Sequence, residues 1–306
     1  MKTNCTHFNP SKTAFYDLMP GNGGPNLRII VRNGSFFRKS DSKRVSRYYC
    51  RICRKHFSRA SFQVCFGQKK RRVNTPLQKL LVSGVSQRRA AILLKIDSKT
   101  VARKLKFLAD QARLKHEDWL KQFELNPINS IQFDDLETSE HSKCKPLSVS
   151  LAVDPSSRKI IGFQVSQMPA KGHLASIARR RYGFRKDERS KGWNELMKAL
   201  KPMVTSKVLF TSDENPHYPK YIFRHHPSAT HETTPGRRGC VVGQGELKRG
   251  GFDPLFTLNH TCAMLRANLN RLFRRTWCTT KKRQGLIDHL SLYMVYHNQV
   301  LTPSAV

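Results

Sequence analysis

Basic side chains dominate this sequence: 56 lysines and arginines stand against 21 aspartates and glutamates, which gives a formal net charge of +35. Residues 1–125 hold 28 of the basic and 7 of the acidic side chains, so this stretch alone carries +21. A polyanion is the expected partner of so basic a chain, and nucleic acid is the usual one. The alternative is a ribosome-like or merely adhesive basic protein. The few acids therefore decide between these alternatives.

Hydropathy and cysteine spacing exclude other classes of protein. No apolar run approaches the roughly 20 residues that span a bilayer, and the start MKTNCTHFNP lacks the apolar core of a secretory signal. A hydrophobic content of 38% is enough for a packed core, and 306 residues suffice for two or three domains. We expect a cytoplasmic protein with no membrane partner, whose eight scattered cysteines are thiols or metal ligands.

Residues 1–75 are predicted to form a small zinc-ribbon-like domain. A Cys-x-x-Cys pair on a tight turn points two thiolates at one metal ion, which is half of a tetrahedral zinc site. A domain this short and basic has little core, so bound Zn²⁺ would supply folding energy that burial cannot. The alternative is a pair of reduced cysteines in a small β-hairpin. The expected ligands are Cys5, His7, Cys50 and Cys53, with His56 as a further possibility.

Residues 76–125 are predicted to form a helix-turn-helix DNA-binding domain. Apolar residues recur at helical spacing in three segments, and the stretch 85–105 is typical of two helices joined by a short turn. Ser98 is expected to cap a helix over 98–113. The alternative is an ordinary basic helical hairpin, since the turn contains no glycine. The side chains expected to face DNA are Arg88, Arg89, Ser98, Lys99, Thr100, Arg103 and Lys104.

From residue 126 onward the pattern is that of an α/β domain. Alternating or continuous apolar runs predict strands, and longer amphipathic stretches predict helices. The expected strands are 131–136, 147–153, 159–165 and 207–211, of which the second and third form a hairpin. The expected helices are 173–200, 219–224, 261–275 and 283–297, with a glycine-rich loop over 236–251.

Carboxylates occur on two of these strands. Asp134 and Asp135 interrupt an apolar strand, and Asp213 follows another. Hard oxygen ligands suit Mg²⁺, and two such ions can activate a water or a 3′ hydroxyl and neutralise the leaving oxygen in phosphodiester chemistry. Each aspartate alone could instead pair with an arginine or cap a helix. Because side chains alternate along a strand, Asp135 is expected to point away from Asp134.

The order of these motifs carries a resemblance that covers nearly the whole chain. The motifs are the Cys-x-x-Cys pair, the stretch 85–105, Phe133-Asp134-Asp135-Leu136, Thr211-Ser212-Asp213 with Pro216 and Tyr218, and the stretch from Asn259-His260-Thr261 to Lys281. In this order they resemble bacterial insertion-sequence transposases of the DDE class. The resemblance implies an RNase H-like catalytic domain over 126–306, a mixed sheet flanked by helices. Asp134 and Asp213 match the first and second aspartates of that family.

The same resemblance implies an activity, cofactors and partners. It implies strand cleavage and strand transfer with Mg²⁺ (or Mn²⁺), on double-stranded DNA at the ends of an insertion sequence. A homo-oligomer on DNA, associated with the bacterial nucleoid, is the expected form.

This chain departs from the family's pattern at the third acid. The family carries a glutamate on the late helix a few residues after His-Thr, whereas this chain has Met264-Leu265 there and no acid from Thr261 to Lys282. Glu246, 33 positions after Asp213, is one candidate for the third ligand, and Asn268 is a neutral one. A site without a third ligand would belong to an impaired copy.

Two functions of different class therefore stay open. The first is a transposase, and the second is a non-catalytic or degenerate DNA-binding regulator derived from one. The third carboxylate separates them. A nuclease with an RNase H-like domain is a weaker alternative, because it leaves the N-terminal modules unexplained.

Overall fold

The computed structural model describes residues 29–39, 41–235, 253–273 and 277–302. The chain divides into two compact units, Met1–Pro76 and Leu77–Val306, and each is described by itself. Three predicted ligands, Cys5, His7 and Glu246, lie outside the described residues.

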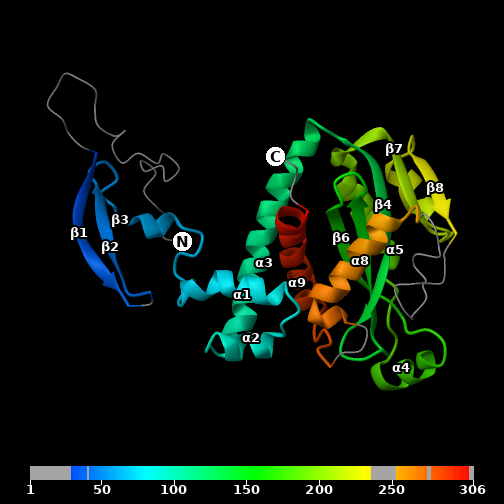
Figure 1. Cartoon of the computed structure of the whole chain (residues 1–306), viewed down its shortest axis with the longest axis horizontal. Helices are drawn as coiled ribbons and strands as arrows, with labels where there is room; N and C mark the ends of the chain where they lie inside the picture. The colour runs from blue at the N-terminus through cyan, green and yellow to red at the C-terminus, as the bar shows by residue number, and fades with distance from the viewer. Residues whose placement is uncertain (1–28, 40, 236–252, 274–276, 303–306) are drawn as a thin grey trace. The chain divides into compact units, whose positions relative to one another are not determined.

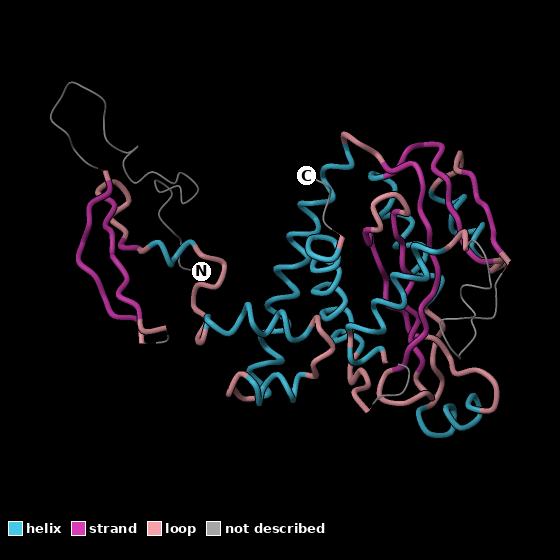
Figure 2. The backbone as a smooth tube through the Cα atoms, viewed as in Figure 1, coloured by secondary structure: helices cyan, strands magenta, loops and turns pink. Residues whose placement is uncertain are grey.

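The first unit contains a three-stranded antiparallel sheet, drawn in magenta in Figure 2. Its strands are β1 (Ile30–Arg38), β2 (Lys43–Cys50) and β3 (His56–Phe57), followed by the 3-10 turns η1 (Arg59–Phe62) and η2 (Arg71–Val73). The buried core of this sheet is small: Cys50 and Phe57 are buried, and the ring of Phe62 packs edge-on against Phe57 at 5.6 Å. So little buried apolar surface is a weak source of stability.

Three helices precede the larger sheet. They are α1 (Asn74–Leu81), α2 (Gln87–Leu93) and α3 (Ser98–Leu120), with the turn η3 (Lys121–Glu124) after them. The predicted cap of α3 is wrong by one residue. The Asp97 carboxylate accepts the N–H of Lys99 at 2.8 Å, and Ser98 is the first helical residue. The turn before α3 passes through Lys95 at φ +50°, a left-handed conformation in a residue other than glycine.

The second unit is built on a mixed sheet of five strands, and the mixed sheet flanked by helices that the resemblance implies is confirmed. Its strands are β4 (Ile128–Ser139), β5 (Pro146–Asp154), β6 (Lys159–Gln167), β7 (Val204–Asp213) and β8 (Thr230–Thr234), in the spatial order β6-β5-β4-β7-β8. β5 is antiparallel to both of its neighbours, β4 and β6, whereas β7 is parallel to both β4 and β8. Strand β8 was not predicted, because its sequence THETT is polar and mostly exposed.

Helices cover both faces of this sheet (Figure 1). On one face α5 (Arg189–Leu200) and α6 (Tyr218–His225) pack on side chains that include Phe133 and Phe210. On the other, α8 (Phe256–Asn268) and α9 (Arg283–Tyr296) share a core with α3 and with β4 and β5. Gly192 lets α5 approach β6 closely, since a Cβ there would lie 2.1 Å from the Ser166 Oγ.

Two predicted helices have different bounds. The stretch 173–200 forms α4 (Leu174–Tyr182) and α5, because Gly183 ends α4 at φ +75°. The helix expected over 261–275 begins earlier, where the Asp253 carboxylate accepts the N–H of Leu255 at 2.9 Å, and ends before the turn η5 (Asn270–Leu272). The turn η4 (Lys201–Met203) precedes β7, and η6 (His297–Leu301) follows α9. None of the helices described is both long and apolar enough to cross a membrane.

Candidate functional site

The parallel pairing of β4 with β7 brings two of the predicted acids to one face of the sheet. Gln132 of β4 is the partner of Thr211 of β7. Paired residues of neighbouring strands share a face, and so do residues two positions further along. Asp134 and Asp213 therefore lie side by side on the face that α8 covers.

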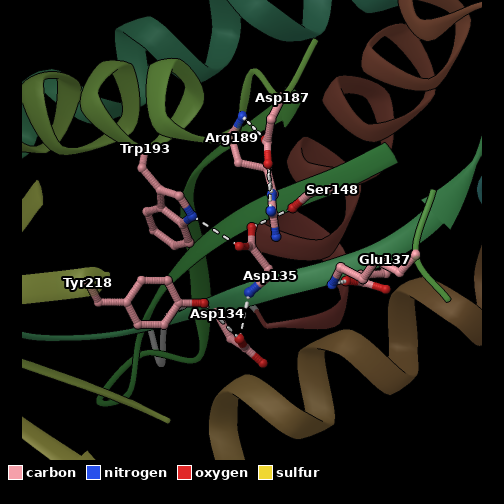
Figure 3. A network of polar contacts seen from close by, with 9 residues as sticks. Asp134, Asp135, Glu137, Ser148, Asp187, Arg189, Trp193 and Tyr218 are labelled. Atoms are coloured by element: carbon pink, nitrogen blue, oxygen red, sulfur yellow. Dashed lines mark hydrogen bonds and ion pairs between the residues drawn. The ribbon is translucent and has the colours of Figure 1, made fainter. Parts of the chain in front are cut away.

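Asp134 is held by two hydrogen bonds to the same carboxylate oxygen (Figure 3). Its Oδ1 accepts the N–H of Asp135 at 2.6 Å and the hydroxyl of Tyr218 at 3.1 Å. Among the described residues no donor reaches its Oδ2. Burial raises the pKa of the Asp134 carboxyl to about 6, and the Asp213 carboxylate adds to the rise. Burial and the nearby carboxylates also raise the pKa of the Tyr218 hydroxyl, so that group stays a donor.

Asp213 does not cap the helix that follows it. Its Oδ1 accepts the N–H of Asn215 at 3.2 Å, within the turn after β7. Helix α6 begins only at Tyr218, after His217. The helix-cap alternative for Asp213 is therefore wrong.

Neither aspartate has a basic partner in the described part of the chain, where no lysine, arginine or histidine nitrogen lies within 4.0 Å of its carboxylate. Other acids of the same unit do have such partners, at 2.9 Å for Glu137 with Lys171 and 2.6 Å for Asp187 with Arg189. The arginine-pair alternative for Asp134 thus finds no support in the described residues.

Asp135 points to the opposite face of β4, as strand alternation predicts. Its Oδ1 accepts the hydroxyl of Ser148 at 2.6 Å, and its Oδ2 accepts the indole N–H of Trp193 at 3.0 Å (Figure 3). The hydroxyl of Ser150 also donates to Oδ1, at 2.8 Å. All of its partners are neutral donors on β5 and α5. Asp135 thus joins three elements in the interior, and the sequence did not indicate these partners. Serines at alternate positions of a buried strand were the available signal.

Helix α8 is fixed beside the aspartates by Gln132. The Gln132 side chain donates to the carbonyl of Pro254 at 2.7 Å and accepts the N–H of Leu258 at 3.1 Å. On the same helix, burial raises the pKa of the Cys262 thiol to about 12, and the Asp134 carboxylate adds to the rise. Cys262 therefore presents a neutral thiol on the helix that covers this face of the sheet.

The structure brings no third acid to this pair within the described residues. Helix α8, FTLNHTCAMLRAN, contains no acid, and Asp253 uses its second carboxylate oxygen to accept from the Asn259 amide at 2.9 Å. Asn268 lies at the far end of α8, where its amide donates to the carbonyl of Met264 and the hydroxyl of Tyr293. No group of three His, Cys, Asp or Glu residues able to hold a metal occurs in the parts of the chain described.

Most of the predicted DNA-facing side chains are accessible. Those that are exposed are Arg88, Arg89, Ser98, Lys99 and Arg103, and Thr100 is half-buried. The prediction that Lys104 faces outward is wrong, because it is only 5% exposed. Lys104 lies three residues after Val101 and four before Leu108, both buried, so helical periodicity places it in the apolar stripe of α3.

Cys50 and Cys53 lie together in the core of the first unit. Cys50 ends β2 and is buried, and the partly buried Cys53 lies in the turn toward β3. The N–H of Cys50 donates to the carbonyl of Lys55 at 3.0 Å, which closes this turn. The ring of His56 lies 4.8 Å from the ring of Tyr49, tilted by 39°, and its Nδ1 lies 3.0 Å from the Asn33 amide.

No family model matches the chain, and no curated protein sequence matches it. The chemistry of the Asp134–Asp213 pair has to be inferred from its own surroundings.

The two neighbouring aspartates should respond oppositely to loss of charge. At pH 8 in chelator, Asp134→Asn should be as stable as the parent or up to about 3 kcal/mol more stable, since a carboxyl whose pKa rises on folding costs stability once it ionises. Asp135→Asn should lose about 2 kcal/mol, because an amide group replaces an acceptor that three donors share. Urea denaturation of the two variants and the parent measures both changes. A similar loss in both variants would contradict these assignments.

Proposed function

We propose that the chain is a DNA transposase of the DDE class, which cleaves the ends of an insertion sequence and joins them to target DNA. The strand order β6-β5-β4-β7-β8, in which β5 runs antiparallel to the other four strands of this sheet, is compatible with an RNase H-like catalytic domain. The observation that carries the proposal is the Asp134–Asp213 pair: two carboxylates on one face, without a basic partner among the described residues, in a chain of net charge +35. The protein would act as a homo-oligomer on double-stranded DNA in the bacterial cytoplasm, near the nucleoid.

The donor set fits Mg²⁺ or Mn²⁺. Mg²⁺ is usually held by one or two carboxylates together with substrate phosphates. Two carboxylates lie together here, and burial, with a smaller contribution from the Asp213 charge, raises the pKa of Asp134; a bound cation would offset both effects. A divalent ion bound there supplies activation of the attacking oxygen and charge for the leaving oxygen.

The chain's own residues orient these ligands. Tyr218 and the N–H of Asp135 hold one oxygen of Asp134, so the other oxygen would be the one to bind a cation. Glu246 is the proposed third ligand. The absence of an acid from α8 favours the second candidate function, a non-catalytic regulator that keeps only the DNA-binding modules.

Cleavage of a duplex that carries the element's ends, with Mg²⁺, tests the catalytic proposal. Asp134→Asn and Asp213→Asn should each lower the rate roughly 10²-fold or more, because each removes a charge that stabilises the reacting phosphate. DNA affinity should not change. Glu246→Gln should match them if Glu246 is a ligand and stay within a few-fold of the parent if it is not. The exposed Glu137→Gln is the matched control and should retain full activity.

Two results would refute the transposase proposal. One is near-parental cleavage by Asp134→Asn. The other is a parent protein that binds the DNA ends tightly yet never cleaves them with Mg²⁺ or Mn²⁺, which would establish the regulator instead.

We further propose that α2 and the start of α3 bind the DNA ends through exposed basic side chains. Each lost phosphate contact should reduce the slope of log K against log salt by about 0.9. Arg88→Gln and Arg103→Gln in the full chain should show this reduction. Lys115→Gln, an exposed lysine further along α3, is the control and should keep the parental slope. Unchanged slopes in all three variants would remove these helices from the DNA interface.

A structural Zn²⁺ in the first unit is the remaining proposal, with Cys50 and Cys53 as two ligands and Cys5 and His7 as the candidates for the others. Metal analysis of the full chain should find about one equivalent of zinc, as a single structural site requires. Cys50→Ser should lose it, whereas Cys144→Ser in the second unit should retain it. A zinc-free parent protein with an intact fold would contradict the site.

A further inference from the structure

A cavity of about 480 Å³ opens beside α4, apart from the aspartate pair. Its walls come from the turn between β4 and β5, the end of β6 and the segment that joins α4 to α5. Figure 1 shows α4 at one end of the sheet, away from the helices that cover its faces. Ligand pockets of about 300–1,000 Å³ accommodate molecules of the size of a nucleotide.

Two aromatic side chains at this cavity are open to solvent. Phe184 is 82% exposed and Tyr182 is 44% exposed, on either side of Gly183, whose φ of +75° turns the chain between them. Covering large exposed apolar surfaces with a flat ligand is favourable, because it removes them from water. Any of the nucleobases can stack on such rings, so this contact does not depend on the DNA sequence.

Positive charge surrounds these rings. Lys145, Arg179 and Lys186 line the cavity, and the Lys145 ammonium lies 4.5 Å from the centre of the Tyr182 ring. No carboxylate among the described residues lies within 4.0 Å of these three cations. The nearby acids are engaged by other arginines, Glu140 by Arg185 at 3.5 Å and Asp187 by Arg189 at 2.6 Å. The cavity is therefore complementary to a phosphate.

Strand β4 connects this cavity to the aspartate pair. Beyond Asp134 this strand continues to Ser139, and Glu140 begins the turn that borders the cavity. At about 3.3 Å per residue, the six positions from Asp134 to Glu140 span about 20 Å. A DNA strand with a phosphate at the aspartates can thus reach the cavity within a few nucleotides.

We propose that this cavity binds one unpaired nucleotide of a DNA strand, with its base on Tyr182 and Phe184 and its phosphate near Arg179 and Lys186. The Gln167 amide, which also lines the cavity, offers a donor and an acceptor to the base edge. The inference rests on the proposed function only in taking DNA as the ligand. It adds that the protein binds a single-stranded nucleotide about 20 Å along β4 from the proposed cleavage site.

Binding of the full chain to two labelled DNAs, in chelator so that no cleavage occurs, tests the proposal. The probes are a blunt duplex and the same duplex with a five-nucleotide single-stranded extension. The extension should raise the affinity of the parent about ten-fold, the size expected for base–aromatic stacking. The double variant Tyr182→Ala with Phe184→Ala should lose this gain and keep the parental affinity for the blunt duplex. Phe223→Ala, an exposed aromatic of α6 outside the cavity, should keep both affinities.

The charge and the ligand class are tested in the same assay. Arg179→Gln and Lys186→Gln should each lower the salt slope of the extended probe by about 0.7, the value for single strands, more than that of the blunt one. No gain from the extension, or a gain that survives in the double aromatic variant, overturns the proposal and leaves duplex binding and cleavage untouched. Displacement of the extension by poly-glutamate as readily as by a single strand overturns it in favour of an acidic peptide. A parent that binds neither DNA refutes the proposed function as well.

Discussion

Strand β4 is hydrogen-bonded along both edges, to β5 on one side and β7 on the other, and the rest of the second unit is arranged around it. Its side chains alternate between two helical layers. Phe133 and Asp135 face α5, whereas Gln132 and Asp134 face α8. The parallel register with β7 then adds Asp213 on the α8 side. One strand thus provides an aromatic core residue, an internal polar anchor and one half of the carboxylate pair.

Asp134 and Asp135 differ in what compensates the burial of their charge. A buried carboxylate is costly unless donors or a cation compensate it. Three neutral donors reach Asp135, two of them on one oxygen and one on the other, whereas both donors to Asp134 share a single oxygen. Asp134 also faces another carboxylate, which raises its pKa further. An uncompensated carboxylate in a chain so rich in arginine and lysine is the kind of perturbed group that marks functional sites.

Hydrophobic periodicity along the sequence was enough to predict several of the strands. Apolar alternation located β4, β5 and β6, and the same rule predicted that Asp134 and Asp135 diverge. The charge of Lys104 predicts an exposed position, but the helical stripe that it shares with Val101 and Leu108 is buried. The hydrogen bond from Tyr218 to Asp134 joins residues 84 positions apart, and the bond from Trp193 to Asp135 joins residues 58 apart. No spacing in the sequence reports contacts of that kind, which only the assembled sheet creates.

The composition of α8 bears on how the proposed cation site would work. Leu258, Thr261 and Leu265 are buried on this helix. The Asp134 carboxylate adds to the rise that burial causes in the pKa of the Cys262 thiol on the same helix. A carboxylate at any of the three buried positions would need to displace core packing, so a third acid has little room on the helix itself. With two carboxylates and a neutral thiol, the described residues supply less negative charge than three acids would. Substrate phosphates would then contribute to the proposed coordination, and the cation would bind more tightly when DNA is present. If the proposed function holds, that dependence would keep the site of this chain, whose net charge is +35, from acting before a polyanionic substrate has bound.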